Sequence, residues 1–504
     1  MCLSQANTNM DFLDPKKKQA HARRLYLGYF LMGIALLLAA SILLILSNGY
    51  DVDRKTGQVI QNGLIFTNSA PESTTIYLNG KANGQTDKRL TVPEGTYNVE
   101  LQRTGYTTWK KTVQLDGGNI ERLVYPRLFP SKLTTAVSKT YDAIPSFSAQ
   151  SPDRRWLLVT QPGQFNSFDI YDTGKPTQAA TVTTIPEGVL TKPAAGAAET
   201  LTMVEWSTDN RHVLVKHTFG DAFEYAVIDR SSTENNSYNV TKVTGLSPTL
   251  VALHDKKYDR LFIYDATAKT LQTVNVEDKT VAPLLGGVLA FKPYGSKTVL
   301  YASEDDVHPG KTLLRILDDG KNYTMRTFDT PSSLLLDLAE FDGSMYVTAA
   351  STTEGRLYIY KDPLARLKSD SKTALTPFVL IRFKDPTKIS FSANTRFVAM
   401  QSGTRFAVYD FEEARRYNFT LPGELPADQF ASWMDGHRLV LNQANTVQVF
   451  EFDGANQTKL GSLVANSLPF FDRDYKRLYT LSPDAAGTTK ASIVRTSLKL
   501  KQNP

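Results

Sequence analysis

The sequence contains a single cysteine, Cys2, in 504 residues. Because a disulfide needs two thiols, the chain forms no internal disulfide, and cysteine-based zinc sites and dithiol redox chemistry are excluded. Cys2 also precedes the apolar segment described below, whereas a lipid-modified cysteine follows one, so a lipoprotein is excluded. The folded part of the chain is therefore expected to depend on its hydrophobic cores alone.

Local catalytic motifs are also missing. The sequence has neither the G-x-S-x-G nucleophile elbow nor the H-E-x-x-H zinc motif. Of its six histidines, only His212 and His217 lie close together, and their odd spacing on a predicted strand and its turn directs them to opposite faces. We therefore predict no catalytic residue, no cofactor and no metal site, and we interpret the chain as non-enzymatic.

Two further segments only partly match known ligand loops. Gly310-Lys311-Thr312 resembles the end of a phosphate-binding loop, but Asp305 stands where the first glycine belongs and no strand-to-helix unit surrounds it. The carboxylate pairs at 305–306 and 318–319 lack the spacing of a calcium-binding loop. Both segments are interpreted as solvated turns.

The excess of basic residues is small and lies mainly at the N-terminus. The formal net charge is +6, and residues 1–24 supply half of it with five Lys or Arg and two Asp. The rest of the chain has too little positive charge for a nucleic-acid surface, so no nucleic-acid partner is predicted.

Leu25 to Leu46 form an apolar run of 22 residues without a charged side chain. As a helix this run measures about 33 Å, enough to cross the hydrocarbon layer of a bilayer. Its basic flank lies on the N-terminal side, so the positive-inside rule places residues 1–24 in the cytoplasm. A cleaved signal peptide would have a shorter apolar run and a better cleavage site than Leu46-Ser47-Asn48. We predict a single-pass signal anchor over 25–47 in the plasma membrane, with an extracytoplasmic C-terminal part.

A polar stretch at 48–62 is interpreted as a spacer, and the segments after it predict a small β-sandwich over 63–120. Thr75 to Leu78, Tyr97 to Leu101 and Trp109 to Leu115 alternate between apolar and polar residues, as half-buried strands do. Asn79-Gly80 is a strong signal for a tight hairpin turn.

This region resembles the PEGA domain family over about residues 63–118. The family's turn is present as Pro93-Glu94-Gly95-Thr96, with Thr in the place of Ala, and Ser69-Ala70-Pro71, Ile76 to Lys81 and Gly105-Tyr106 also match. The resemblance implies a small extracytoplasmic β-sandwich of prokaryotic envelope or surface-layer-like proteins, and it brings no catalytic residues with it.

The matched turn residues are expected to have structural roles. Gly80 and Gly95 allow positive φ, and Pro93 fixes φ. Glu94 lies between Pro93 and Gly95 in the turn. Trp109 is the one residue of this module considered for ligand contact, since a partly exposed indole stacks on sugars.

From about residue 127 the sequence repeats. An apolar strand, a turn with Asp and a basic residue, a second strand and a third strand ending in Asp recur, as in 151–172 and 204–229. Eight copies of about 46 residues fit 127–499, a length typical of four-stranded propeller blades, and irregular spacing at 246–305 leaves seven open. The repeated Asp and basic residues are expected to tie neighbouring strands by hydrogen bonds.

The copy Ser151-Pro152-Asp153-Arg154-Arg155-Trp156 resembles the TolB-like and WD-type β-propellers. No helical period runs through the region, so we predict an all-β ectodomain made of a PEGA-like sandwich and a β-propeller on one transmembrane helix. Closure of the ring should bring the C-terminal strand beside the start of the array and remove exposed sheet edges.

An anchor, a small sandwich and a propeller without a recognisable site favour a membrane-anchored binding or scaffold protein of the cell envelope, with an envelope protein or glycan as partner. Glycosidase carboxylates meet only in space, so a carbohydrate-active hydrolase or lyase acting on wall glycans at the propeller axis stays open. A second alternative is an extracytoplasmic sensor, whose tail of 24 residues would need a cytoplasmic partner.

Overall fold

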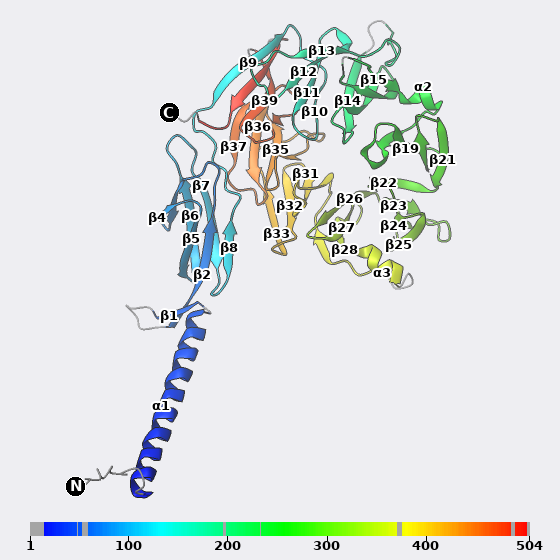
Figure 1. The fold of residues 1–504 in the computed structure, drawn as a ribbon. Helices are drawn as coiled ribbons and strands as arrows, with labels where there is room; N and C mark the ends of the chain where they lie inside the picture. The colour runs from blue at the N-terminus through cyan, green and yellow to red at the C-terminus, as the bar shows by residue number, and fades with distance from the viewer. Residues whose placement is uncertain are drawn as a thin grey trace, which may run out of the picture. The chain divides into compact units, whose positions relative to one another are not determined.

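The computed structural model describes residues 15–47, 49–52, 59–194, 198–231, 233–369, 375–484 and 489–500. Cys2 and most of the basic tail lie outside the described residues. The chain divides into two compact units, Met1–Leu128 and Phe129–Pro504. The first holds a long helix followed by two small sheets, and the second is built from sheets with only short helices between them (Figure 1).

The long helix α1 (Pro15–Ser47) contains the predicted apolar run. Within its segment Gln19–Ser47, the most apolar 18 residues have a mean hydropathy of 2.7 and none of them is buried, so the segment is long and apolar enough to cross a membrane. Leu37 and Leu43 are typical, with 70% and 66% of their surface exposed. A membrane anchor and a signal sequence both have this length and composition.

Two antiparallel sheets form the rest of the first unit. One contains β1 (Tyr50–Val52), β2 (Val59–Thr67) and β5 (Lys88–Pro93), with β8 (Ile120–Leu123) pairing β2 in parallel. The other has the order β4 (Lys81–Gln85), β3 (Thr75–Leu78), β6 (Gly95–Gln102), β7 (Trp109–Leu115). Every second side chain points into one shared core, which includes Ile65, Leu90, Ile76, Val99 and Val113.

Gly63 allows the two sheets to approach each other. A Cβ added to Gly63 on β2 would lie 2.7 Å from Leu115 Cγ on β7, which is closer than any real contact. A side chain at this position would therefore push the sheets apart.

The stretch at 48–62 differs from the expected spacer. Tyr50 pairs with Gln61 and Val52 with Val59, so strand β1 and the first part of β2 form a two-stranded extension; residues 53–58 lie outside the described residues. Tyr50 is 39% and Val59 67% exposed, and none of the side chains that the structure describes in this extension is buried. Such a segment leaves no alternating pattern of buried and exposed residues in the sequence.

In the second unit, the described residues form eight four-stranded antiparallel sheets. The first four contain, in order, β10 (Ser148–Gln150), β11 (Trp156–Gln161), β12 (Gln164–Asp172), β13 (Thr181–Thr184); β14 (Glu199–Trp206), β15 (His212–Phe219), β16 (Ala222–Asp229), β17 (Tyr238–Asn239); β18 (Leu250–Leu253), β19 (Arg260–Asp265), β20 (Thr270–Asn275), β21 (Thr280–Leu285); β22 (Val288–Tyr294), β23 (Thr298–Glu304), β24 (Thr312–Asp318) and β25 (Lys321–Phe328).

The next three sheets follow the same order, and the last one takes a strand from the start of the unit. They contain β26 (Leu334–Phe341), β27 (Ser344–Ser351), β28 (Arg356–Lys361), β29 (Val379–Arg382); β30 (Lys388–Phe391), β31 (Phe397–Ser402), β32 (Arg405–Asp410), β33 (Arg415–Thr420); β34 (Ser432–Trp433), β35 (Arg438–Gln443), β36 (Thr446–Glu451), β37 (Thr458–Ser462); β38 (Phe470–Phe471), β39 (Arg477–Pro483), β40 (Ala491–Ser497) and β9 (Thr134–Tyr141). The short helices are α2 (Val240–Thr244), the 3₁₀ turn η2 (His254–Lys256) and α3 (Pro363–Ser369).

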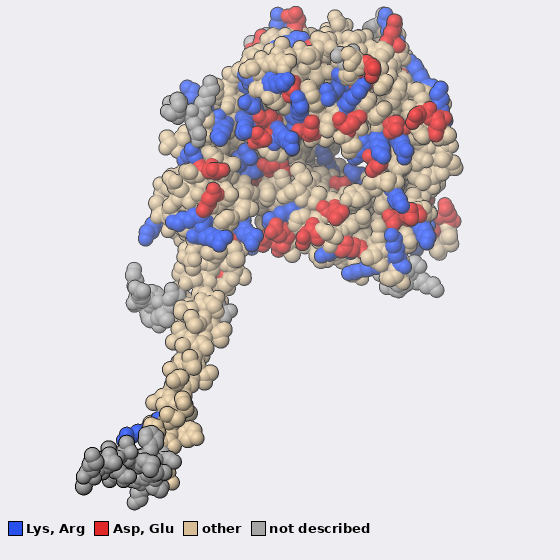
Figure 2. Space-filling model, viewed as in Figure 1, with Lys and Arg blue, Asp and Glu red and all other residues tan. Residues whose placement is uncertain are grey.

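The sheets follow one another around a ring, with the first strand of each sheet on the inside (Figure 1). Inner strands of neighbouring sheets contact each other, as β22 contacts β26, and an ion pair of 3.1 Å joins Lys292 on β22 to Asp337 on β26. The face shown in Figure 2 is hollowed near the centre of the ring, and side chains of both charges surround the hollow. This arrangement confirms the predicted all-β fold of the propeller class.

Each hydrophobic core lies between two neighbouring sheets. Leu158 on β11 faces the second sheet and packs with Val213 and Val215, whereas Leu157 faces the last sheet and packs with Tyr479 and Leu481. Alternate residues of one strand therefore serve two cores. This is why strands such as 156–161 appear as nearly continuous apolar runs in the sequence.

The ring is closed by β9, which pairs antiparallel with β40 from Thr134↔Ser497 to Tyr141↔Ala491. The strand that opens the unit thus becomes the outermost strand of the last sheet. The C-terminal strand was expected beside the start of the array, and this pairing confirms it.

A buried polar cluster joins β9 to the first sheet. The Asp169 carboxylate on β12 is fully buried and accepts hydrogen bonds from Lys139 Nζ (2.6 Å), Tyr141 Oη (2.6 Å) and Gln161 Nε2 (2.8 Å). Tyr141 Oη also lies 2.8 Å from Tyr171 Oη. Burial is the main cause that raises the pKa of Tyr141, so its hydroxyl keeps the proton that it donates.

We expect Asp169→Ala to lower the free energy of unfolding by about 2–4 kcal/mol, because it leaves Lys139 and Tyr141 without their shared acceptor. Urea unfolding of the full chain, followed by tryptophan fluorescence, measures the change. Asp319→Asn is the matched control, since Asp319 and its partner Lys297 are 72% and 67% exposed. Equal stability of the two variants would contradict the proposed role of the cluster.

Candidate functional site

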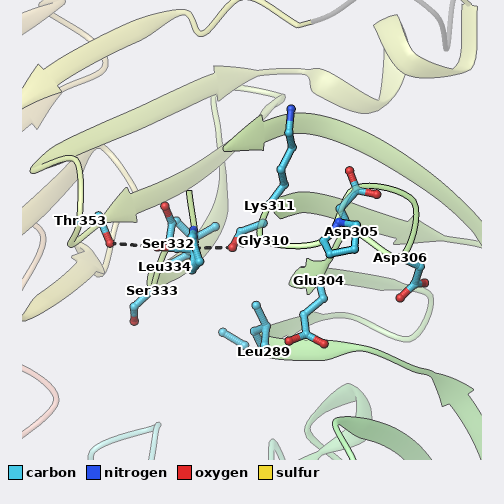
Figure 3. A pocket seen from close by; sticks show the side chains of 14 residues that line it. Leu289, Glu304, Asp305, Asp306, Gly310, Lys311, Ser332, Ser333, Leu334 and Thr353 are labelled. Atoms are coloured by element: carbon cyan, nitrogen blue, oxygen red, sulfur yellow. Dashed lines mark hydrogen bonds between the residues drawn. The ribbon is translucent and has the colours of Figure 1, made fainter. Parts of the chain in front are cut away.

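A pocket of about 750 Å³ lies between the fourth and fifth sheets of the propeller (Figure 3). Its walls come from three connections on one face of the ring: 305–311 after β23, 329–333 before β26, and 352–355 after β27. In an antiparallel sheet, the second strand ends at the edge where the third strand begins. The inner strand of the next sheet begins at this same edge, so the connections of the fourth and fifth sheets lie side by side.

Carboxylates dominate the polar lining on one side of this pocket, where Glu304, Asp305 and Asp306 follow each other at the end of β23. The Glu304 carboxylate lies 2.5 Å from Lys269 Nζ. Within the residues that the structure describes, the Asp306 carboxylate has no hydrogen-bond or ion-pair partner. Asp306 is therefore free to accept hydrogen bonds from a ligand.

Asp305 is already engaged with its own turn. Its carboxylate accepts hydrogen bonds from the backbone N–H groups of Val307 (3.0 Å) and His308 (3.2 Å) and lies 3.1 Å from His308 Nδ1. Burial acts to raise the pKa of Asp305, but these hydrogen bonds and the His308 ring outweigh it and hold the pKa below its usual value. Such a carboxylate orders the loop and stays ionised.

The opposite side of the pocket is formed by hydroxyl and apolar groups. Ser333 is exposed before β26, and Thr353 Oγ1 lies 3.5 Å from the carbonyl oxygen of Pro331. Leu289 and Leu334 supply the apolar surface. The pocket thus combines carboxylate acceptors, hydroxyls and a small apolar patch.

The segment Gly310-Lys311-Thr312 lines this same pocket. Gly310 and Lys311 lie in the loop that the sequence predicts, whereas Thr312 is buried at the start of β24. Thr312 Oγ1 accepts a hydrogen bond of 3.0 Å from the backbone N–H of Ser332, which fixes the two connections to each other. Lys311 Nζ lies 3.0 Å from Asp329, and Figure 3 shows its side chain extending away from Leu289 and Glu304. The lysine is therefore not placed over the carboxylates.

The repeated Asp and Arg residues tie strands within several of the sheets, as the repeat predicts. Arg211 and Asp229 form two parallel hydrogen bonds of 2.8 and 2.6 Å, and Arg396 forms the equivalent pair of 2.9 and 2.6 Å with Asp410. In both cases an Arg just before the second strand binds the Asp that ends the third. Bidentate geometry fixes both strand ends, so these residues maintain the sheets.

His212 and His217 lie on opposite faces of β15, which confirms the direction predicted from their spacing. The His212 ring stacks on Tyr258 at 3.7 Å, on the side of the third sheet. His217 is fully buried on the other side, with Nδ1 2.9 Å from Glu224 and Nε2 2.8 Å from Glu199. Within the described residues, no group of three His, Cys, Asp or Glu is arranged to hold a metal ion.

The PEGA-like turn residues have backbone roles. Asn79 and Gly80 have φ of 48° and 80°, the pair of positive values that the predicted tight turn requires. The Pro93 carbonyl oxygen accepts a hydrogen bond of 2.7 Å from Tyr97 Oη, and Glu94 N–H donates one of 2.9 Å to Gln61. Gly95, at φ 153°, begins β6.

The interpretation of Trp109 as a sugar-stacking residue is wrong. Its side chain is only 2% exposed and lies in the core of the first unit, edge-to-face with Tyr125 at 6.2 Å. Trp109 shares the inward face of β7 with Val113 and Leu115, and alternation along the strand decides its direction.

Sequence reasoning missed the pocket. Asp306 was interpreted only as part of a solvated turn, and Glu304 and Ser333 were not singled out. One signal was available in the sequence. The acidic run 304–306 lies at the end of the second strand of one sheet, and Ser332-Ser333 precedes the inner strand of the following sheet. Those two positions lie at the same edge of neighbouring sheets in a propeller.

Glu224 gives a prediction of pH dependence. Burial acts to raise its pKa, but hydrogen bonds from Thr191, His217 and Asn239 outweigh burial and lower the pKa below its ordinary value of 4.5. A carboxyl with a lowered folded-state pKa adds stability above that value and loses it as the pH falls. Glu224→Gln should thus lower the free energy of unfolding by about 1–3 kcal/mol at pH 7.

The deficit of Glu224→Gln relative to the wild-type chain should shrink as the pH falls from about 5 to 3. Urea unfolding at a series of pH values measures it. Glu424→Gln, at an exposed carboxylate, is the control and should follow the wild-type curve. A deficit that is absent at pH 7, or constant with pH, would contradict this account of Glu224.

Comparison with known proteins identifies one part of the chain by sequence. Residues 62–125 match the family described as the PEGA domain. This confirms the resemblance stated for 63–118 and assigns it to the small β-sandwich of the first unit. No curated protein matches the chain.

Solved structures similar to this chain include β-propellers of different activities. Oligogalacturonate lyase from Vibrio parahaemolyticus is 10% identical, with 73% of this chain and 99% of that chain covered at a TM-score of 0.38. Kluyveromyces lactis Hsv2 is 11% identical, with 61% and 93% covered at 0.39. The Myceliophteria thermophila Cps50 (Swd1) β-propeller domain is 9% identical, with 73% and 100% covered at 0.33. At these scores the likeness carries no argument about ligand or activity.

Proposed function

We propose that the protein is a non-enzymatic, membrane-anchored binding protein of a prokaryotic cell envelope, whose propeller binds a polyhydroxylated ligand such as a glycan. The observation that carries the proposal is the pocket of about 750 Å³ lined by Glu304, Asp305 and Asp306. Its volume is within the range of sites for small molecules or a few sugar units, about 300–1,000 Å³.

The chemistry of the lining supports binding of hydroxyl groups. An ionised carboxylate accepts hydrogen bonds at two oxygens, which suits neighbouring hydroxyls of a sugar. Asp306 has this capacity unused in the described part of the chain, and Ser333 on the opposite wall both donates and accepts. Leu289 offers a surface for the apolar face of a ring.

The state of Asp305 supports binding over catalysis. A general acid or base works best when its pKa lies near the working pH, and hydrogen bonds hold the pKa of Asp305 below even its usual value. A hydrolase or lyase acting on the same polymer is the alternative, and turnover distinguishes it from a binding protein.

The anchoring part of the proposal rests on α1. Its apolar side chains are exposed over the length of a bilayer, and the basic residues of the chain's first 24 positions all precede the apolar run. The positive-inside rule then places the N-terminus in the cytoplasm and the sheets outside the plasma membrane. The match of 62–125 to the PEGA domain fits this location.

We also propose that the eight four-stranded sheets are the eight blades of one closed propeller. The β9–β40 pairing supports this count, because it gives the last sheet the fourth strand that each of the other seven sheets has. A closed ring holds the connections around the pocket in fixed positions, so the site is formed before the ligand arrives.

The binding test uses the full chain in detergent, titrated with purified envelope glycans and compared with Asp306→Asn and Ser333→Trp. The first removes the free carboxylate and should weaken binding roughly tenfold. The second fills the pocket and should abolish binding. Asp319→Asn removes an exposed carboxylate elsewhere and should bind like the wild type. Equal affinities for all four proteins, or turnover of a glycan by the wild type, would overturn the proposal.

The topology test adds protease to intact cells that produce the chain with an epitope at each end. The C-terminal epitope should be lost and the N-terminal epitope should survive, because only the C-terminal epitope lies outside the cell in the proposed orientation. Permeabilised cells, in which both are digested, provide the control. Survival of the C-terminal epitope on intact cells would contradict the proposed orientation.

A further inference from the structure

A second pocket, of about 490 Å³, lies at the seam where the propeller closes. Its walls come from the start of β9, the end of β40, the turn before β39 and the connection at 176–177 in the first sheet. It therefore touches both sides of the β9–β40 junction.

The charged residues around this seam pocket are all basic. Lys476, Arg477, Arg495 and Lys499 line it, and no Asp or Glu does so among the described residues. Two of the four have acidic partners outside the lining: Lys476 with Asp474 at 2.6 Å and Arg477 with Asp472 at 3.1 Å.

Arg495 and Lys499 have no acidic partner in the part of the chain that the structure describes. One guanidinium nitrogen of Arg495 donates to the carbonyl oxygen of Pro176, which holds the side chain in place across the seam. The remaining N–H groups of Arg495 are then available to a ligand in a fixed orientation. Lys499 is exposed at the rim.

This lack of acidic partners contrasts with Arg211 and Arg396 in the second and sixth sheets. Arg211 and Arg396 each form a bidentate pair with an Asp of their own sheet. Four cations that converge on a cavity repel one another, and only two of them are neutralised by a neighbouring carboxylate. Structural ion pairing therefore accounts for Arg211 and Arg396 and does not account for the seam pocket.

We propose that the seam pocket binds a phosphate-type oxyanion through Arg495 and Lys499, with Lys476 and Arg477 adding positive potential. A guanidinium matches phosphate oxygens with paired N–H groups, and an ammonium supplies a point charge. Thr135, Thr177 and Ser497 place hydroxyl groups on the same lining. The seam pocket differs in charge and in location from the acidic pocket between the fourth and fifth sheets. Its ligand, a phosphate-bearing polymer, therefore belongs to a different class from the glycan proposed for the acidic pocket.

The location adds a consequence for stability. A ligand that binds the closed ring and not the open one stabilises the closed ring by mass action. Because the pocket walls belong to β9, to β40 and to the first sheet, a bound phosphate group would hold together the strands whose separation opens the propeller.

The experiment titrates the full chain in detergent with sodium phosphate and with inorganic polyphosphate, and follows binding by calorimetry and stability by thermal unfolding. Polyphosphate should bind more tightly than phosphate, raise the unfolding temperature and lose affinity as the salt concentration rises. Polygalacturonate, a polymer of carboxylates, should bind at least tenfold more weakly. Equal binding of the two polymers would overturn the assignment to phosphate.

The variants separate a site from general surface charge. Lys499→Gln, at an exposed side chain, should weaken polyphosphate binding several-fold without changing the unfolding temperature of the free chain. Arg495→Gln with Lys499→Gln should weaken it more than tenfold. Lys297→Gln, at an exposed lysine of the fourth sheet, should bind like the wild type, and so should Asp306→Asn. Unchanged affinity in the Arg495/Lys499 variant, or equal loss in Lys297→Gln, would overturn the proposal.

Discussion

The pairing of β9 with β40 is the contact on which the propeller depends. Each sheet is covered on both sides by its neighbours, so an open ring would leave the flank of the first sheet and the edge of the last one in water. The closing contacts join residues that are far apart in the chain, such as Thr140 and Ser492, which are 352 positions apart. Such contacts form late in folding, because loop closure must precede them. The buried Asp169 cluster supports the same junction, since Lys139 and Tyr141 belong to β9 and Asp169 to the first sheet.

Charge in the propeller is distributed in two ways. Pairs such as Arg211–Asp229 match acidic and basic residues by geometry and hold neighbouring strands in register. In the two pockets the matching is incomplete. One pocket presents the Asp306 carboxylate, and the other presents Arg495 on β40 and Lys499 just after it, without acidic partners in the described residues. The paired charges stabilise the sheets, while the unpaired charges of the pockets are available to ligands.

The strands could be predicted from sequence wherever burial leaves a local pattern. Alternation revealed β3, β6 and β7, and the apolar runs revealed inner pairs such as β11 and β12. The strands that escaped prediction bury few of their described side chains: Tyr50 of β1 and Val59 at the start of β2 are exposed, and β9 shows a single buried residue, Tyr141, over its length. Trp109 was misjudged because exposure is decided by the register of β7 against its partner sheet. The pockets escaped for a related reason, since each is built from residues of different sheets that meet only in the folded ring.

The position of β9 has a mechanical consequence. It is the first strand of its unit, and the chain reaches it directly from Phe129, at the boundary with the first unit. A pulling force transmitted along the backbone from the N-terminal side therefore reaches the propeller at its closing strand before it reaches any other sheet. The Phe129 side chain, buried between the last two sheets, resists that force first, and the hydrogen bonds between β9 and β40 and the Asp169 cluster follow. Chain connectivity thus directs tension onto the strand that closes the ring.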